Sequence, residues 1–229
     1  MTYAEANKID FAKIPVIDIT SLRNGEDKNT IALQLHQASQ NLGFIYVKNH
    51  GIPETIIQNI REDGLSFFRQ DNTIKQEVKI SKKHRGWLGF GGAKMNDNAK
   101  ADLKESFIWG YQDKKGICSE DHPLRGKNLW PNSLPNLEKN AMNFFNYADG
   151  LAKDLLKGFA IGLNLKEDFF VNFLKGFFLN SEGFPFFSPY ALLLSFLLNL
   201  EAGRLSLLLS SLLNLEAGRL SLLLSSLLN

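Results

Sequence analysis

Apolar residues recur at helical spacing in three stretches of the first 175 residues. The first stretch spans residues 27–42 and is followed by Gly43, which is typical of the residue that ends a helix. The second spans residues 53–69, and the third and longest spans residues 137–163, where Asn164 is placed to cap the end. We therefore predict three helices, the last of about seven turns.

Short runs of β-branched and aromatic residues predict three strands, at residues 14–19, 44–47 and 105–109. Residues 71–83 alternate in charge and contain few apolar positions, and the glycine-rich segment 87–92 follows them, so we expect this region to be exposed and mobile. An irregular stretch that contains prolines is expected from residue 114 to 135.

The pattern changes completely after Lys175. Residues 197–211 recur without a single change as residues 212–226, and a third copy begins at Leu227. Natural repeat families use units of 20 residues or more and vary between copies, and a 15-residue unit would rotate its leucines around a helix. We interpret residues 176–229 as a leucine-rich, helical tail of low complexity, left by a reading-frame error, a tandem duplication or an artificial origin.

Composition adds to this division. The chain has 26 Lys and Arg, 24 Asp and Glu, and a net charge of +2, but only five of these charged residues lie beyond Lys175. The small net charge gives no sign of a nucleic-acid partner. Cys118 is the only cysteine and the first residues lack a secretory signal, so we expect a cytoplasmic protein. Residues 184–200 carry no charge, but prolines interrupt them, and we expect no membrane span.

Motifs in residues 10–175 resemble the amino-terminal half of the isopenicillin-N-synthase-like 2-oxoglutarate- and iron(II)-dependent oxygenases. Five motifs occur in the order found in that family, and a sixth, Leu165 to Phe170, resembles the segment that precedes the family's catalytic barrel. The five are Ile14-Pro15-Val16-Ile17-Asp18, Gly43 to Pro53, His84-Arg85-Gly86-Trp87, Asp102 to Gly110, and Asn128-Leu129-Trp130-Pro131.

The resemblance implies an enzyme with a double-stranded β-helix, or jelly roll, that oxidises a small molecule with O₂ and 2-oxoglutarate. In such a family a His-x-Asp pair and a later His bind iron(II), and an Arg-x-Ser pair holds 2-oxoglutarate. The fold class expected here is α+β: an amino-terminal helix and strand module (residues 1–175), with the catalytic barrel missing or incomplete, followed by the tail (residues 176–229).

The metal ligands of this family are absent from the sequence. None of the four histidines is followed two places later by Asp, and no histidine occurs after His122. Arg204-Leu205-Ser206 matches Arg-x-Ser, but it lies inside the identical repeat, without a preceding barrel strand or histidine. We therefore predict no catalytic residue, no metal site and no bound cofactor in this chain.

The resemblance leaves Arg85, Trp87 and Phe107 as the candidate substrate-binding residues, because they border the substrate pocket in the family. The alternative, equally weighted, is a solvated arginine and two core-filling aromatic residues. His50 is expected to be a turn histidine that bonds to backbone, and His36 a half-exposed surface residue. We reject a phosphate loop at the glycine-rich segment and do not favour a metal site at His84 and His122.

Two hypotheses follow from the sequence. The chain is an oxygenase by family but inactive as written, or it is a non-catalytic fragment and interaction module that aggregates, or associates with membranes, through its leucine-rich tail. In both cases we expect self-association through exposed apolar surface, because the helix at 137–163 lacks a barrel to cover.

Overall fold

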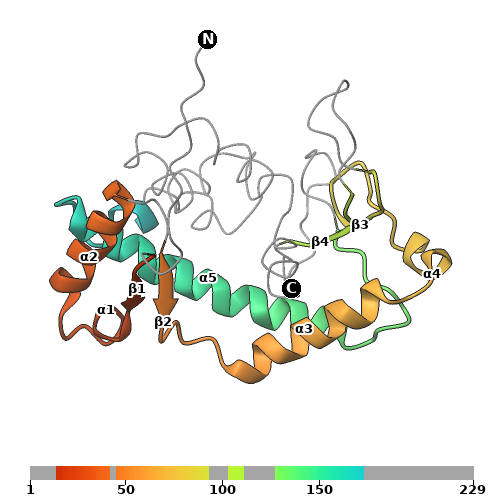
Figure 1. The fold of residues 1–229 in the computed structure, drawn as a ribbon, viewed down its shortest axis with the longest axis horizontal. Coiled ribbons are helices and arrows are strands. Elements are labelled where there is room, and N and C mark those ends of the chain that lie inside the picture. Colours follow the sequence, from red (N-terminus) through yellow and green to blue (C-terminus); the bar gives the residue numbers. More distant parts are fainter. Residues whose placement is uncertain (1–13, 42–44, 93–102, 111–126, 173–229) are drawn as a thin grey trace, which may run out of the picture.

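A computed structural model gives the fold, and it describes residues 14–41, 45–92, 103–110 and 127–172. The named elements of the described residues are five helices and four short strands, with the other elements arranged along the longest helix, α5 (Figure 1). In chain order the elements are β1 (Val16–Asp18), α1 (Thr20–Asn24), α2 (Lys28–Asn41), β2 (Tyr46–Lys48), α3 (Glu54–Phe68), α4 (Asn72–Gln76), β3 (Gly86–Leu88), β4 (Ser106–Ile108) and α5 (Leu137–Gly162).

The three helices predicted from apolar spacing are confirmed as α2, α3 and α5. Helix α5 ends where the sequence indicated: Asn164 adopts a left-handed backbone, with φ of 57°, and its N–H donates to the Ile161 carbonyl. The short helix α1 was not predicted. It starts where the Thr20 N–H donates to the Asp18 carboxylate, 3.0 Å away, and it stops at Gly25, whose φ of 84° suits glycine.

The strands form two separate pairs. Strands β1 and β2 are parallel, with Val16 opposite Tyr46, and β3 and β4 are antiparallel, with Trp87 opposite Phe107. All three predicted strands are found, although each is shorter than expected, and β2 begins two residues later than the predicted start.

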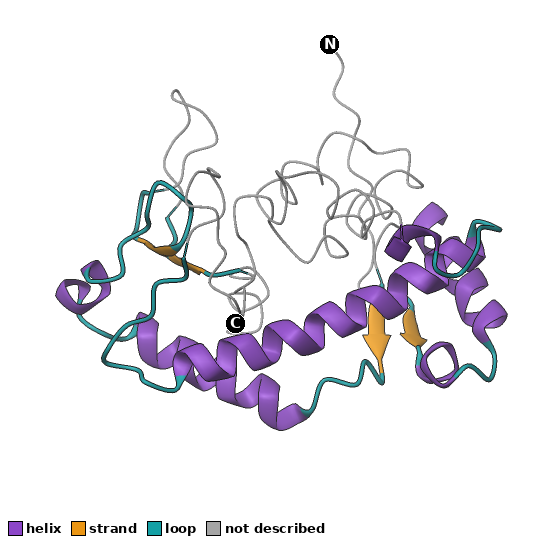
Figure 2. Ribbon diagram, turned by 180° about the vertical axis from the view of Figure 1, so that it is seen from behind, coloured by secondary structure: helices purple, strands orange, loops and turns teal. Residues whose placement is uncertain are grey.

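Helix α5 runs between two groups of shorter elements (Figure 2). A hydrophobic cluster lies at each of its ends. At 26 residues it is about 39 Å long, enough to support both clusters. Its carboxyl-terminal half packs with β1, α1 and α2 in a mainly aliphatic cluster, which also takes in Phe170 and Val171. Its amino-terminal half packs with α3, β3 and β4 in a mainly aromatic cluster. We call these the aliphatic end and the aromatic end.

The expectation of an exposed region between residues 71 and 92 is only partly correct, and its mobility stays a prediction. Helix α4 and strand β3 lie there, and Lys75, Val78 and Trp87 are buried. The backbone N–H of Trp87 donates to the Val78 carbonyl at 2.6 Å, and the backbone N–H of Ile80 donates to the Trp87 carbonyl at 2.7 Å. The charged side chain of Lys75 is paired inside the structure with Glu105.

The predicted leucine-rich tail and most of the predicted irregular stretch lie outside the described residues. Within the described ranges, no helix is both long and apolar enough to cross a membrane.

Candidate functional site

The candidate residues Arg85, Trp87 and Phe107 come together on the β3–β4 pair. Trp87 and Phe107 are direct register partners, and Arg85 immediately precedes β3. All three are buried, with relative exposures of 4%, 5% and 5%.

Aromatic rings surround Phe107. Its ring centroid lies 4.7 Å from that of Phe67, 6.3 Å from that of Trp109 and 6.0 Å from that of Trp130. Phe107 and Trp109 also line a small apolar cavity with Leu137 and residues of α3. Trp87 and Phe107 therefore fill a core, as the second interpretation of these residues expected, and whether they also contact a substrate stays a prediction.

Arg85 is not the solvated arginine of that interpretation. Its guanidinium lies against Gly110, so closely that a Cβ on residue 110 would be 2.5 Å from Arg85 Nη2. Arg85 Nη1 also donates to the His84 carbonyl, 3.1 Å away. The Arg85 guanidinium therefore occupies the space that a side chain at position 110 would need. Any residue there other than glycine would have to displace the guanidinium.

Asn128 fixes the backbone beneath Arg85. Its Oδ1 accepts from the Gly110 N–H and its Nδ2 donates to the Gly110 carbonyl, both at 2.9 Å. Asn128 is a buried polar residue, only 5% exposed, and it was not among the candidate residues chosen from the sequence. The available signal was its place in the Asn-Leu-Trp-Pro motif.

A second missed group is the ion pair of Lys75 and Glu105. Lys75 Nζ lies 2.8 Å from Glu105 Oε2, and the same oxygen accepts from Trp87 Nε1 at 2.7 Å. Lys75 also lies 5.2 Å from the centre of the Trp87 ring, within cation–π range. The alternating charges of residues 71–83 suggested exposure, but one of them, Lys75, is buried and paired with Glu105.

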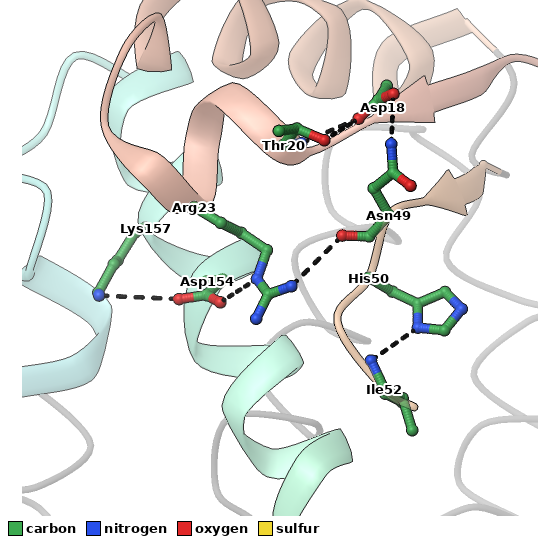
Figure 3. A network of polar contacts seen from close by, with 8 residues as sticks. All are labelled: Asp18, Thr20, Arg23, Asn49, His50, Ile52, Asp154 and Lys157. Carbon is green, nitrogen blue, oxygen red and sulfur yellow. Dashed lines mark hydrogen bonds and ion pairs between the residues drawn. The ribbon is translucent and has the colours of Figure 1, made fainter. Parts of the chain in front are cut away.

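The carboxyl ends of β1 and β2 carry an exposed polar network (Figure 3). Asp18 accepts from Thr20 Oγ1 at 2.6 Å and from Asn49 Nδ2 at 2.7 Å. These donors, Thr20 first, lower the pKa of Asp18 to about 2. His50 Nδ1 accepts from the Ile52 N–H at 3.1 Å, which confirms the expected turn histidine.

Arg23 connects this network to α5 (Figure 3). Its Nε donates to Asp154 Oδ2 at 3.1 Å, and its Nη1 lies 3.4 Å from the Asn49 carbonyl oxygen. The guanidinium covers Gly51, where a Cβ would be 1.7 Å from Arg23 Nη1. An open groove of about 630 Å³ runs beside Arg23 and His50, but its charged groups are of both signs, and Arg23 already donates to Asp154.

The histidines do not assemble a metal site in the part of the chain that the structure describes. His36 lies half-buried on α2, His50 follows β2, and His84 lies in an exposed turn with φ of 54°. No group of three His, Cys, Asp or Glu side chains there is arranged to hold an ion. His122 lies outside the described residues.

Comparison with known sequences finds one family along most of the described chain. Residues 14–133 match the profile described as non-haem dioxygenase in morphine synthesis, N-terminal. The chain is 29% identical over 182 residues to a protein of Dictyostelium discoideum named as an iron/ascorbate oxidoreductase, covering 73% of this chain and 50% of that protein. It is 27% identical over 172 residues to 1-aminocyclopropane-1-carboxylate oxidase of Dictyostelium mucoroides, covering 71% and 46%.

Solved structures give the same result for the fold. A 2OG-Fe(II) oxygenase family protein of Caulobacter crescentus superposes with a TM-score of 0.60 at 24% identity, covering 69% of this chain and 51% of that one. A full-length protein of Neurospora crassa, solved in complex with alpha-KG, superposes with a TM-score of 0.59 at 25% identity, covering 71% and 51%. The chain therefore spans about half the length of the relatives it matches.

Proposed function

Because the chain belongs to the non-haem dioxygenase family, through the amino-terminal region of that family, we propose that it forms the substrate-binding half of a 2-oxoglutarate- and iron(II)-dependent oxygenase. The substrate is a small molecule. Arg85 contacts a polar or anionic group of it, and Trp87 and Phe107 contact its apolar part. The observation that supports the proposal is a buried guanidinium, packed against Gly110, on the same strand pair as the buried aromatic residues Trp87 and Phe107, at residues that the shared motifs contain.

We further propose that these 229 residues do not carry out the oxidation alone. When bound in an oxygenase of this type, iron(II) and 2-oxoglutarate supply the activation of O₂. The residues of this chain do not fit the metal, because the sequence has no His-x-Asp pair and the described histidines lie in separate elements. Manganese(II), the usual redox-inert substitute, should therefore find no preformed site.

A thermal melt tests this proposal. The full chain is melted anaerobically with and without manganese(II) plus 2-oxoglutarate, and we expect the same midpoint in both. A ligand in hundredfold excess over its Kd would stabilise the fold by about 2.7 kcal/mol. An upward shift would overturn the proposed inactivity. The double variant His84→Ala/His122→Ala would then show whether the shift depends on those two residues.

Self-association is a second candidate function, and one observation favours it. Val16 and Tyr46 are register partners in a parallel strand pair, and they are 65% and 52% exposed. Parallel strands are normally covered on both faces, so this pair is suited to packing against a second copy of the chain.

Size-exclusion chromatography with light scattering tests this second candidate. We expect the full chain to elute as an oligomer, and the double variant Val16→Thr/Tyr46→Thr to shift toward monomer. Leu33→Ser is the control, because Leu33 is also exposed but lies on α2. A sharp monomer peak from the unmodified chain would count against self-association.

A further inference from the structure

We propose that Glu105 is a positioning residue for the substrate-binding side chains. Its carboxylate holds the Trp87 indole in one orientation, and Lys75 supplies the opposite charge that lets the carboxylate remain inside the structure. This inference rests on the proposed function, in which Trp87 contacts the substrate beside Arg85.

A single oxygen atom carries the arrangement. Glu105 Oε2 accepts from Trp87 Nε1 at 2.7 Å and from Lys75 Nζ at 2.8 Å. Lys75 Nζ also donates to the Phe68 carbonyl at 3.2 Å. The carboxylate thus connects α4, β3 and the end of α3 to the residue that precedes β4.

Burial makes these contacts specific. The side chains of Lys75 and Glu105 are 5% and 15% exposed, so neither charge is well hydrated and each depends on the other. Hydrogen bonds to an ionised acceptor are stronger than neutral ones, and this one fixes the edge of a ring that could otherwise rotate within an apolar core.

The other tryptophans of the aromatic end are held differently. Trp109 and Trp130 each have a buried Nε1 with no hydrogen-bond partner among the described residues. Packing alone keeps them in place, whereas Trp87 has a charged acceptor as well. The Trp87 ring also lies over Gly89, where a Cβ would be 3.0 Å from the ring atom Cη2. One orientation of Trp87 is therefore specified from two sides.

Three variants of the full chain separate positioning from simple stabilisation. Glu105→Ala removes the acceptor and Lys75→Met keeps it. The double variant Lys75→Glu/Glu105→Lys restores the ion pair but puts an ammonium group, which cannot accept a hydrogen bond, next to Trp87 Nε1. The measurement is the ¹⁵N–¹H spectrum of tryptophan-labelled protein, in which the three indoles give three signals, assigned with Trp87→Phe.

We expect the Trp87 indole signal to move upfield and its hydrogen exchange to accelerate about tenfold in Glu105→Ala and in the charge-exchanged variant. It should stay near its original position in Lys75→Met. The Trp109 and Trp130 signals should change little, which makes them internal controls. If the charge-exchanged variant does not fold, Glu105→Gln replaces it, and we expect a smaller displacement of the same signal.

An unmoved Trp87 signal in folded Glu105→Ala would overturn the inference, and so would an equal displacement in Lys75→Met. Glu105 would then only stabilise the fold through its ion pair. The manganese melt does not involve these residues, so a result that overturns the proposed inactivity can be told apart from one that overturns this inference.

Discussion

The two ends of α5 use their polar side chains in opposite ways. At the aliphatic end the ion pairs are near the surface: the side chains of Arg23 and Asp154 are 38% and 27% exposed, and those of Lys28 and Glu167 are 34% and 39%. At the aromatic end, Lys75, Arg85 and Asn128 are all buried. Burying polar groups costs free energy unless each finds a partner.

This difference supports the proposal that the substrate-binding residues lie at the aromatic end. The aliphatic end combines buried apolar contacts with ion pairs near the surface. At the aromatic end, Lys75 and Asn128 are buried polar side chains held by specific partners, an arrangement that is common where a ligand is recognised. Three predictions test this contrast, and they are given in order of decreasing size.

Phe159→Ala should have the largest effect, although it lies at the end far from the site. Phe159 is 2% exposed in the aliphatic cluster, and its truncation should lower the free energy of unfolding by about 3–5 kcal/mol. Because α5 is shared, far-UV circular dichroism and tryptophan fluorescence should shift together in a urea titration, even though all three tryptophans belong to the aromatic end.

Leu33→Ala, at an exposed position of α2, is the control and should change stability by less than about 0.5 kcal/mol. A dichroism transition in Phe159→Ala that precedes the fluorescence transition would mean that the two ends unfold independently.

Lys75→Met should have the next largest effect. It leaves the partly buried Glu105 carboxylate without its ammonium partner, and breaking such a pair costs about 3 kcal/mol, at the lower end of the usual range because Glu105 is 15% exposed. Arg23→Met removes an ion pair of similar length at the aliphatic end and should cost about 1 kcal/mol or less. Equal losses in the two variants, measured by urea unfolding, would remove the contrast between buried and surface charges.

The smallest effect concerns Asp18 at low pH. Its folded pKa, about 2, lies below its ordinary value of 3.8, so ionised Asp18 favours the folded state. That contribution is complete above about pH 4 and is lost as the pH falls toward 2. The difference in melting temperature between the original chain and Asp18→Asn should therefore shrink over this range, while a constant difference would mean that the Asp18 charge does not contribute.

The main helices could be predicted because their apolar residues repeat at helical spacing, as in α5, which ends at the predicted cap. The polar contacts of the aromatic end could not be predicted in this way. Lys75 and Glu105 look like ordinary surface charges in the sequence, and only the fold brings residues 30 positions apart into contact. Gly110 and Asn128 were visible as motif residues, but their role depends on the guanidinium that packs against them. Arg85 was chosen because of the resemblance to the oxygenase family, but only the structure shows that it is buried.

Gly51 and Arg23 pack so closely that the side chain at position 23 restricts which residues position 51 can accept. The φ of 76° at Gly51 favours glycine, and the space a larger residue needs is filled by a side chain 28 positions earlier. A shortened residue 23 would relieve the collision but not the backbone strain. Among relatives we therefore expect alanine or asparagine at position 51 only together with a smaller residue at position 23, so the Asn-His-Gly sequence and α1 should evolve as one unit.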